Sequence, residues 1–307
     1  MKLKKPKFWD YKNPNLISNI LYPLSKIVDW YNSTKKKGLK VDGIRTICIG
    51  NIYLGGTGKT SLSIELKKIL DQQKVKTCFI KKNYIDQSDE QQLLKKYGHV
   101  IVDKSRLNAL KTALNLKFKV AIFDDGLQDN RINYDLMFAC FNKKNLIGSG
   151  RIIPSGPLRE SLDKIKIYKN IFLIGNNEKL TKNFLKKYKN INLFQSSYEL
   201  KNNKSFNKTK KYIVFSGIGN HQSFIDMLIK NNFNIIKNFE FPDHYQYKEY
   251  EIKKILNIAK EIKADVVTTE KDFMRLTSKF LNKIKIAKIR LKINKVHKIK
   301  KLLNEIL

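Results

Sequence analysis

The chain has 307 residues, 42% of them hydrophobic and gathered in blocks, which excludes a disordered chain and suffices for one large domain or two smaller ones. No window holds the roughly 18 consecutive apolar residues of a membrane span, and no apolar segment precedes a small-residue cleavage site. The sequence therefore predicts neither a spanning helix nor a secretory leader. A formal net charge of +35 favours anionic partners: lipid, phosphorylated substrate or nucleic acid.

This charge has two interpretations. Nearly all of the basic residues are lysines, which either cover solvated faces without a partner or serve an anionic one. The few arginines carry more information, because planar and bidentate recognition of phosphate favours arginine.

The three cysteines, Cys48, Cys78 and Cys140, lie far apart in the sequence, and each stands in an apolar run. This spacing excludes a CxxC metal site. We expect the three thiols to be buried and reduced in a cytosolic protein.

The first predicted element is an amphipathic helix over about residues 9–31, interrupted near Pro23. Its apolar residues recur every three or four positions, lysines flank it, and tryptophan and tyrosine stand at both ends. Such aromatic rings settle at membrane interfaces. The pattern fits an in-plane membrane anchor and fits equally a helix packed on the domain.

From residue 44 onward, short apolar runs alternate with helical segments, which is typical of parallel strands in an α/β sheet. Strands are expected over residues 45–50, 76–81, 99–103, 120–125, 136–141, 170–175, 211–219, 264–272 and 285–293. Glycine and proline are frequent in residues 143–160, so we expect one domain over 1–160 and a second, smaller α/β domain over 161–307 that closes over the active site. Residues 176–210 are expected to be mostly loop.

The segment GNIYLGGTGKTSLSIEL (residues 50–66) passes from an apolar run through glycines into a helix, as a phosphate-binding loop does. Its predicted nucleotide-binding residues are Gly55, Gly56, Thr57, Gly58, Lys59 and Thr60. Glycines allow positive φ and aim N–H groups inward, lysine binds the β- and γ-phosphates, and the Thr60 hydroxyl can ligate Mg²⁺. The general pattern has glycine where Tyr53 stands, so this loop is a variant.

An acidic partner for the metal is predicted in VAIFDDGLQD (residues 120–129). Its apolar residues lead into Asp124 and Asp125, at the carboxyl end of a strand, where α/β sheets place ligands. Asp124 is the expected Mg²⁺ partner, directly or through water. Together the two motifs predict a P-loop NTPase-like, mostly parallel α/β domain that binds ATP and Mg²⁺.

Three further motifs have both a chemical and a plain structural interpretation. GSGRIIPSGPLRE (148–160) carries Arg151, Arg159 and Glu160, which fit a phosphate clamp or a solvated linker. FSGIGNHQSF (215–224) fits a second anion site or a simple strand-to-helix turn. FPDHYQY (241–247) holds His244, which fits a proton relay or a structural histidine.

Taken in order, these motifs resemble the tetraacyldisaccharide 4′-kinases of lipid A synthesis, through nearly the whole chain. The matching segments are LYPLS, GNIYLGGTGKT, DDGLQD, GRIIPSGPLRE, SGIGNHQSF, FPDHY and TTEKD. The family's loop also lacks the early glycine. The resemblance implies transfer of the ATP γ-phosphate to the 4′-hydroxyl of a tetraacylated glucosamine disaccharide 1-phosphate, with Mg²⁺, at the cytoplasmic face of the bacterial inner membrane. We expect a monomer that binds peripherally to this anionic surface.

The resemblance also implies roles for single residues. Asp124 and Asp125 match the family's metal-associated acidic pair, with a catalytic role for Asp125. Arg159 and Glu160 match a pair near the transferred phosphate. The catalytic base is an aspartate that here corresponds to Asp89 in SDEQ, and His244 supports it.

Two departures from the family pattern stand beside these matches. Where the family usually has SRGYGG after the second strand, this chain has IKKNYID (80–86), with a short connection to Asp89. Where the family has histidine after DDGLQ, this chain has Asp129.

Two rival functions remain open on the sequence. A P-loop ATPase or GTPase that drives assembly at the membrane would turn over nucleotide without a lipid acceptor. The second rival is a non-enzymatic nucleic-acid or membrane binder, suggested by the net charge of +35. It is disfavoured, because the chain has no recognisable nucleic-acid module, arginine-rich arm or aromatic-studded basic strand.

Overall fold

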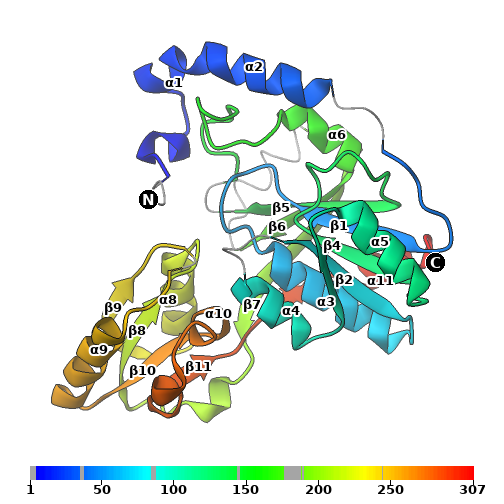
Figure 1. Cartoon of the computed structure of the whole chain (residues 1–307). Helices are drawn as coiled ribbons and strands as arrows, with labels where there is room; N and C mark the ends of the chain where they lie inside the picture. Colours follow the sequence, from blue (N-terminus) through cyan, green and yellow to red (C-terminus); the bar gives the residue numbers. More distant parts are fainter. Residues whose placement is uncertain are drawn as a thin grey trace. The chain divides into compact units, whose positions relative to one another are not determined.

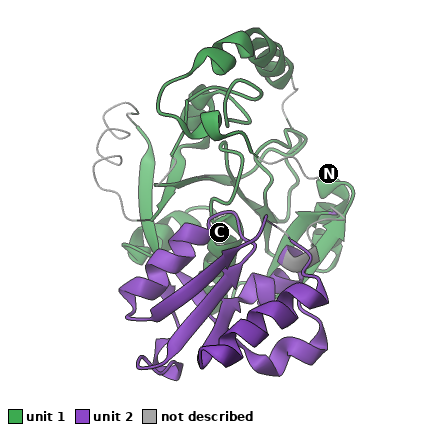
Figure 2. Cartoon of the chain, turned by 90° about the vertical axis from the view of Figure 1, so that its left-hand side faces the viewer, with its two compact units in different colours: residues 1–82, 98–197, 293–307 green, residues 83–97, 198–292 purple. Residues whose placement is uncertain are grey.

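The computed structural model describes residues 5–34, 38–83, 88–143, 146–175, 188, 190–243 and 245–307, and in 88–89 the backbone alone. Its described chain forms two compact units (Figure 2). Unit 1 comprises residues 1–82, 98–197 and 293–307, and unit 2 comprises residues 83–97 and 198–292. This division differs from the expected boundary near residue 160, because unit 1 continues to Ser197 and also includes residues 293–307.

The main sheet has eight strands in the order β12-β7-β6-β5-β1-β4-β2-β3, of which Figure 1 labels β7, β6, β5, β1, β4 and β2. Their bounds are β1 Arg45–Gly50, β2 Thr77–Lys82, β3 Val100–Asp103, β4 Val120–Asp124, β5 Leu136–Asn142, β6 Asn170–Ile174, β7 Asn192–Leu200 and β12 Ile289–Ile293. All pairings from β3 through to β7 are parallel. The predicted parallel α/β class is therefore confirmed.

The central strands of this sheet are buried almost throughout their length, because helices cover them. α3 (Lys59–Gln72) packs on β1, β2 and β4, α5 (Arg106–Asn115) on β2 and β3, and α6 (Ile165–Tyr168) on β5 and β6. α11 (Val296–Asn304) ends the helical part of the chain. The buried thiols of Cys48, Cys78 and Cys140 lie in these strands, as predicted, and burial raises the pKa of Cys78 to about 12.

Unit 2 has a parallel four-stranded sheet in the order β11-β10-β8-β9. Its strands are β8 Lys211–Ser216, β9 Asn234–Glu240, β10 Ala264–Thr269 and β11 Ile284–Ala287, and its helices are α4 Ser88–Lys95, α8 His221–Lys230, α9 Glu249–Glu261 and α10 Glu270–Phe273. Successive residues of β8 enter different clusters: Tyr212 and Val214 pack in one, Ile213 and Phe215 in the other. Each face of the sheet therefore has its own core.

Three sequence expectations were wrong in detail. The segment 176–210, expected to be mostly loop, contains β7. The single strand expected over 285–293 is two strands, of which β11 joins the sheet of unit 2 and β12 the main sheet. β9 was not predicted, since its residues are largely polar and exposed. Short 3₁₀ turns occur at Lys7–Asp10, Leu162–Lys164, Asn203–Ser205 and Ser278–Lys283.

The N-terminal stripe forms α1 (Leu16–Ile20) and α2 (Tyr22–Ser33), separated at Leu21 as the proline predicted. Their buried residues are serines, Ser18 and Ser25. Large apolar side chains on both helices are instead exposed. No helix in the described part of the chain is both long and apolar enough to cross a membrane.

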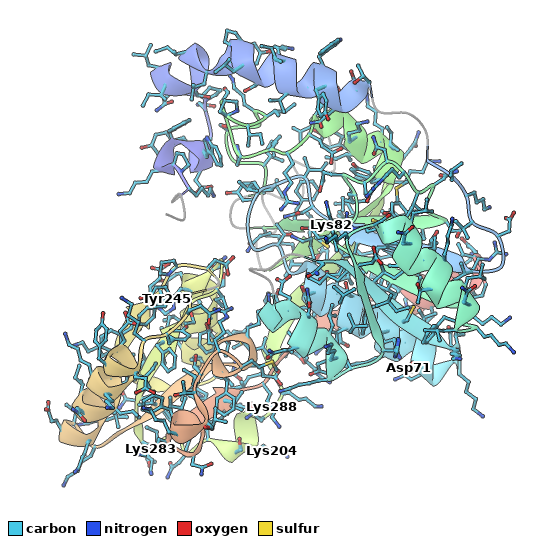
Figure 3. All side chains as sticks on the ribbon, in the orientation of Figure 1. Asp71, Lys82, Lys204, Tyr245, Lys283 and Lys288 are labelled. Carbon is cyan, nitrogen blue, oxygen red and sulfur yellow. The ribbon has the colours of Figure 1, made fainter. Side chains whose placement is uncertain are left out.

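Much of the lysine excess lies on solvated surface. Lys204, Lys283 and Lys288 of unit 2, labelled in Figure 3, are exposed, which both interpretations of the charge expect.

Candidate active site

The phosphate-binding loop has the predicted strand, turn and helix. β1 ends at Gly50, and α3 begins at Lys59. Gly55 and Gly58 have φ values of +136° and +76°, conformations that favour glycine, and Gly58 caps the helix. Gly56, expected to share this property, is not among the glycines with positive φ. The loop therefore delivers Lys59 and Thr60 at the N-terminus of α3, where helix N–H groups attract anions.

The Asn51 side chain stabilises this loop by hydrogen bonds. Its fully buried side-chain amide donates to the carbonyl oxygens of Tyr53 and Gly55, the latter at 3.1 Å, and its Oδ1 accepts from Lys59 Nζ at 3.1 Å. Sequence analysis missed Asn51, although its place between a strand and a glycine turn is a usable signal. The variant residue Tyr53 is itself buried, and its hydroxyl donates to Asp10.

Asp124 stands at the end of β4, beside the start of α3, and its side chain is buried. Its Oδ2 accepts from Thr60 Oγ1 at 3.1 Å and from Lys81 Nζ at 2.8 Å, and its Oδ1 accepts from Ser63 Oγ at 3.2 Å. The structure thus brings together the two residues predicted to hold a metal. Ser63 and Lys81 are additional partners that sequence analysis did not identify.

Asp125 joins the loop lysine to the arginine of the Gly- and Pro-rich segment. It has a φ of +64°, and Arg159 donates to its Oδ1 at 3.0 Å. Lys59 Nζ lies 3.7 Å from the same oxygen. Three segments distant in the sequence therefore place two cations around one carboxylate.

Glu160 is buried and held by two neutral donors. Tyr168 Oη donates to its Oε2 at 2.8 Å, and Gln128 Nε2 donates to its Oε1. Gln128 also donates to the carbonyl oxygen of Asn51 at 3.0 Å and accepts from Arg159 at 3.2 Å. Burial, and then the neighbouring Glu160 carboxylate, raise the pKa of Tyr168, so its hydroxyl stays a donor. Gln128 could have been found within DDGLQD, whereas Tyr168 carries no sequence signal.

Asp129, the departure after DDGLQ, forms an ion pair with Arg106 at 3.2 Å and another with Arg131 at 2.6 Å. Burial raises the pKa of Asp129, but hydrogen bonds from Arg131 and Arg106 outweigh burial and lower it to about 2. Arg106 also donates to the carbonyl oxygen of Asp125. Asp129 therefore supports the backbone of the acidic pair through Arg106.

Three motifs of unit 2 meet at one buried carboxylate. Asp272, from TTEKD, accepts from the Gly217 amide of SGIG at 2.8 Å and from the Tyr247 hydroxyl that follows FPDHY at 2.7 Å. The histidine of SGIGNH, His221, lies 2.6 Å from Ser216 Oγ and is buried. These contacts give the motifs of unit 2 a structural role in shaping the loop after β8.

Two predicted catalytic residues are not placed as side chains. Asp89 lies on α4, where the structure describes the backbone alone, and His244 lies outside the described residues. Their roles remain predictions. Beside Asp89, Glu90 forms an ion pair of 2.7 Å with Lys271, within unit 2.

Comparison with known proteins adds an independent line of evidence. Residues 17–307 match the model of the tetraacyldisaccharide-1-P 4′-kinase family. A tetraacyldisaccharide 4′-kinase of Pelagibacter ubique is 49% identical over 93% of this chain and 92% of its own length. One of Rickettsia typhi is 33% identical over 96% of each chain.

A solved structure, described as the "apo" form of LpxK from Aquifex aeolicus in complex with ATP, has a similar fold. It is 24% identical, with a TM-score of 0.72 over 95% of this chain and 99% of that one. With a matching family model over nearly its whole length and relatives above 30% identity, this chain belongs to the tetraacyldisaccharide-1-P 4′-kinase family.

Proposed function

We propose that this kinase transfers the γ-phosphate of ATP to the 4′-hydroxyl of a tetraacylated glucosamine disaccharide 1-phosphate. One observation carries the proposal: Lys59 and Thr60, at the N-terminus of α3, lie beside Asp125 and Asp124 respectively. This is the arrangement of a loop that binds triphosphate next to an acidic pair. The acceptor of the phosphate, the disaccharide lipid, is inferred from the description of the family, and the donor, ATP, from the resemblance of the loop to phosphate-binding loops.

Lys59 is the proposed ligand of the β- and γ-phosphates. Its ammonium is held between Asn51 and Asp125, so it is oriented before substrate arrives. Backbone N–H groups of the loop and the first turn of α3 would receive the remaining phosphate oxygens. Phosphate oxygens would replace Asp125 as the partner of this ammonium.

Thr60 and Asp124 suit Mg²⁺, because a hydroxyl and a carboxylate oxygen are hard ligands and here lie 3.1 Å apart. Both side chains are buried and come from rigid elements, a helix start and a strand end. When bound, Mg²⁺ would neutralise charge that develops on the phosphates. Thr60 and Asp124 would hold the metal, directly or through water.

Arg159 is proposed to stabilise the transferred phosphoryl group. Asp125 and Gln128 fix its guanidinium, and Gln128 in turn joins it to Glu160. A preorganised cation costs little reorganisation when charge develops in the transition state. Asp125 and Glu160 would act by orienting this cation and its neighbours.

Asp89 is the proposed base that takes the proton from the attacking hydroxyl, with support from His244. The proposal rests on the resemblance of SDEQ and FPDHY to the family motifs, together with the ability of carboxylate and imidazole groups to move protons. If it is right, Asp89→Asn slows phosphoryl transfer far more than it weakens ATP binding. An equal effect on both would place the base elsewhere.

Peripheral binding to an anionic membrane is proposed through α1 and α2. Polar side chains of α2 are turned inward: Ser25 Oγ donates to the carbonyl oxygen of Ile152 at 2.8 Å, and Asn32 Nδ2 donates to that of Arg159 at 3.1 Å. Exposed apolar side chains of the two helices are Leu16, Ile17, Ile20, Tyr22, Leu24, Ile27, Trp30 and Tyr31. A helix with its apolar side exposed and lysines nearby suits a lipid surface, where an acylated substrate resides. The cytoplasmic face and a monomeric state are proposed on the resemblance alone.

The decisive experiment incubates purified protein with Mg²⁺, γ-labelled ATP and tetraacyl disaccharide 1-phosphate in mixed micelles. We expect labelled lipid, and its loss in Lys59→Ala. Lys68→Ala, on the same helix but paired with Glu65, is the matched control and should retain activity. Free labelled phosphate without labelled lipid would support the rival ATPase instead.

A further inference from the structure

Lys81 is a buried cation in the segment that departs from the family pattern. It lies near the end of β2, and the parallel register that pairs Ile80 with Phe123 brings it beside Asp124. Its side chain is 1% exposed, and that of Asp124 is 0% exposed. A lysine this deep in a protein requires an anionic partner, and Asp124 provides one at 2.8 Å.

This ion pair involves the same oxygen that faces Thr60. Asp124 Oδ2 accepts from both Thr60 and Lys81, so the carboxylate proposed to bind Mg²⁺ is already neutralised by a fixed positive charge. A divalent cation that approached this carboxylate alone would meet an ammonium on the same oxygen. Like charges at such short range inside a protein repel strongly, because little water screens them.

We propose that Lys81 is a built-in counter-ion of Asp124 that prevents the carboxylate from binding a divalent cation by itself. The metal then enters with the nucleotide, whose phosphates supply the negative charge that offsets both cations. Lys81 is thus a positioning residue for metal and nucleotide. The inference rests on the proposed function only in taking Asp124 as a metal-binding group, and it is independent of the lipid acceptor.

The test measures Mn²⁺ binding by electron paramagnetic resonance in the absence of nucleotide and lipid. Lys81→Gln removes the charge but retains an amide that can donate to Asp124. We expect this variant to bind Mn²⁺ at least about tenfold more tightly than the wild type. Lys81→Arg, which keeps the charge, should bind as the wild type does.

The double variant Lys81→Gln/Asp124→Asn shows whether the tighter Mn²⁺ binding depends on Asp124. Loss of the tighter binding supports the proposal, whereas its persistence places the metal elsewhere and overturns the proposal. Equal affinity of the wild type and Lys81→Gln also overturns it. If Lys81→Gln does not fold, Lys81→Met, which removes the charge and keeps a side chain of similar length, takes its place in the same comparison with the wild type and should bind Mn²⁺ at least about tenfold more tightly. Equal affinities would refute the role of Lys81, while the lipid-phosphorylation assay would still test the proposed function separately.

Discussion

The exposed apolar side of α1 and α2 allows a quantitative prediction about membrane binding. Ile20, Leu24 and Ile27 are 68%, 51% and 62% exposed. Transfer of a fully exposed side chain of this size out of water stabilises by about 2 kcal/mol, so these partly exposed residues contribute about 1.0 to 1.4 kcal/mol each. Replacement of all three by serine should therefore weaken vesicle binding by about 3 to 4 kcal/mol, or a factor of several hundred.

The assay is co-sedimentation with vesicles that contain anionic lipid, at fixed ionic strength because the chain is strongly basic. The matched control replaces three apolar residues that are exposed elsewhere, Leu116, Ile229 and Ile236, by serine. This control should sediment as the wild type does. Unchanged binding of the helix variant would refute the reasoning, and so would an equal loss in the control, because burial of the α1–α2 side would then not drive association.

The remaining predictions concern the site. Asp129→Asn should lower the free energy of unfolding at pH 7 by about 1 to 2 kcal/mol. Because the folded-state pKa of Asp129 is lowered from 3.8 to about 2, this contribution is present above pH 4 and is lost as the pH falls toward 2. Unfolding of both proteins, measured at a series of acidic pH values, checks this prediction. A constant difference across this range would contradict it. Tyr168→Phe leaves one oxygen of buried Glu160 without its donor, so stability should fall by about 1 to 3 kcal/mol in denaturant unfolding, and an unchanged midpoint would argue against this contact. Asn51→Ala should weaken ATP binding by about tenfold or more, because Lys59 and the loop carbonyl oxygens lose their partner. Calorimetry measures the affinity for ATP, and a wild-type value would show that the loop keeps its shape without Asn51.

The core of the site could be predicted because its signals are local. The strand before Gly50, the glycine turn and the helix after Lys59 each follow from neighbouring residues, and the same holds for the strand that ends at Asp124. Contacts that depend on how side chains pack in three dimensions leave no such local signal. Tyr168 reaches Glu160 through the packing of a single turn of α6, and nothing in its own neighbourhood distinguishes it from other core tyrosines.

Lys81 shows why composition concealed part of the site. In a chain of net charge +35, a lysine carries little information, and most of the lysines that the structure describes lie on solvated faces. Only the register of β2 against β4 reveals that this one is buried on Asp124. β9 escaped prediction for a related reason: an exposed strand with polar residues lacks the apolar run by which buried parallel strands are recognised.

The orientation of the N-terminal helices shows how two interpretations of one pattern can be separated. Hydrophobic periodicity identifies an apolar side but does not say whether protein or lipid covers it. Ser18 and Ser25 supply the answer for the opposite side, since both are buried and donate to carbonyl oxygens of residues 152–155. An ordinary packed helix would turn its leucines and isoleucines toward those carbonyls and leave its serines in water. Here small polar residues let the helix approach the loop that precedes Arg159, and Asn32 donates to the backbone carbonyl oxygen of Arg159. The segment proposed to meet the membrane is therefore joined by one hydrogen bond to the backbone of the arginine proposed to contact the phosphate, and this connection would help to hold an acylated substrate close to the transferred group.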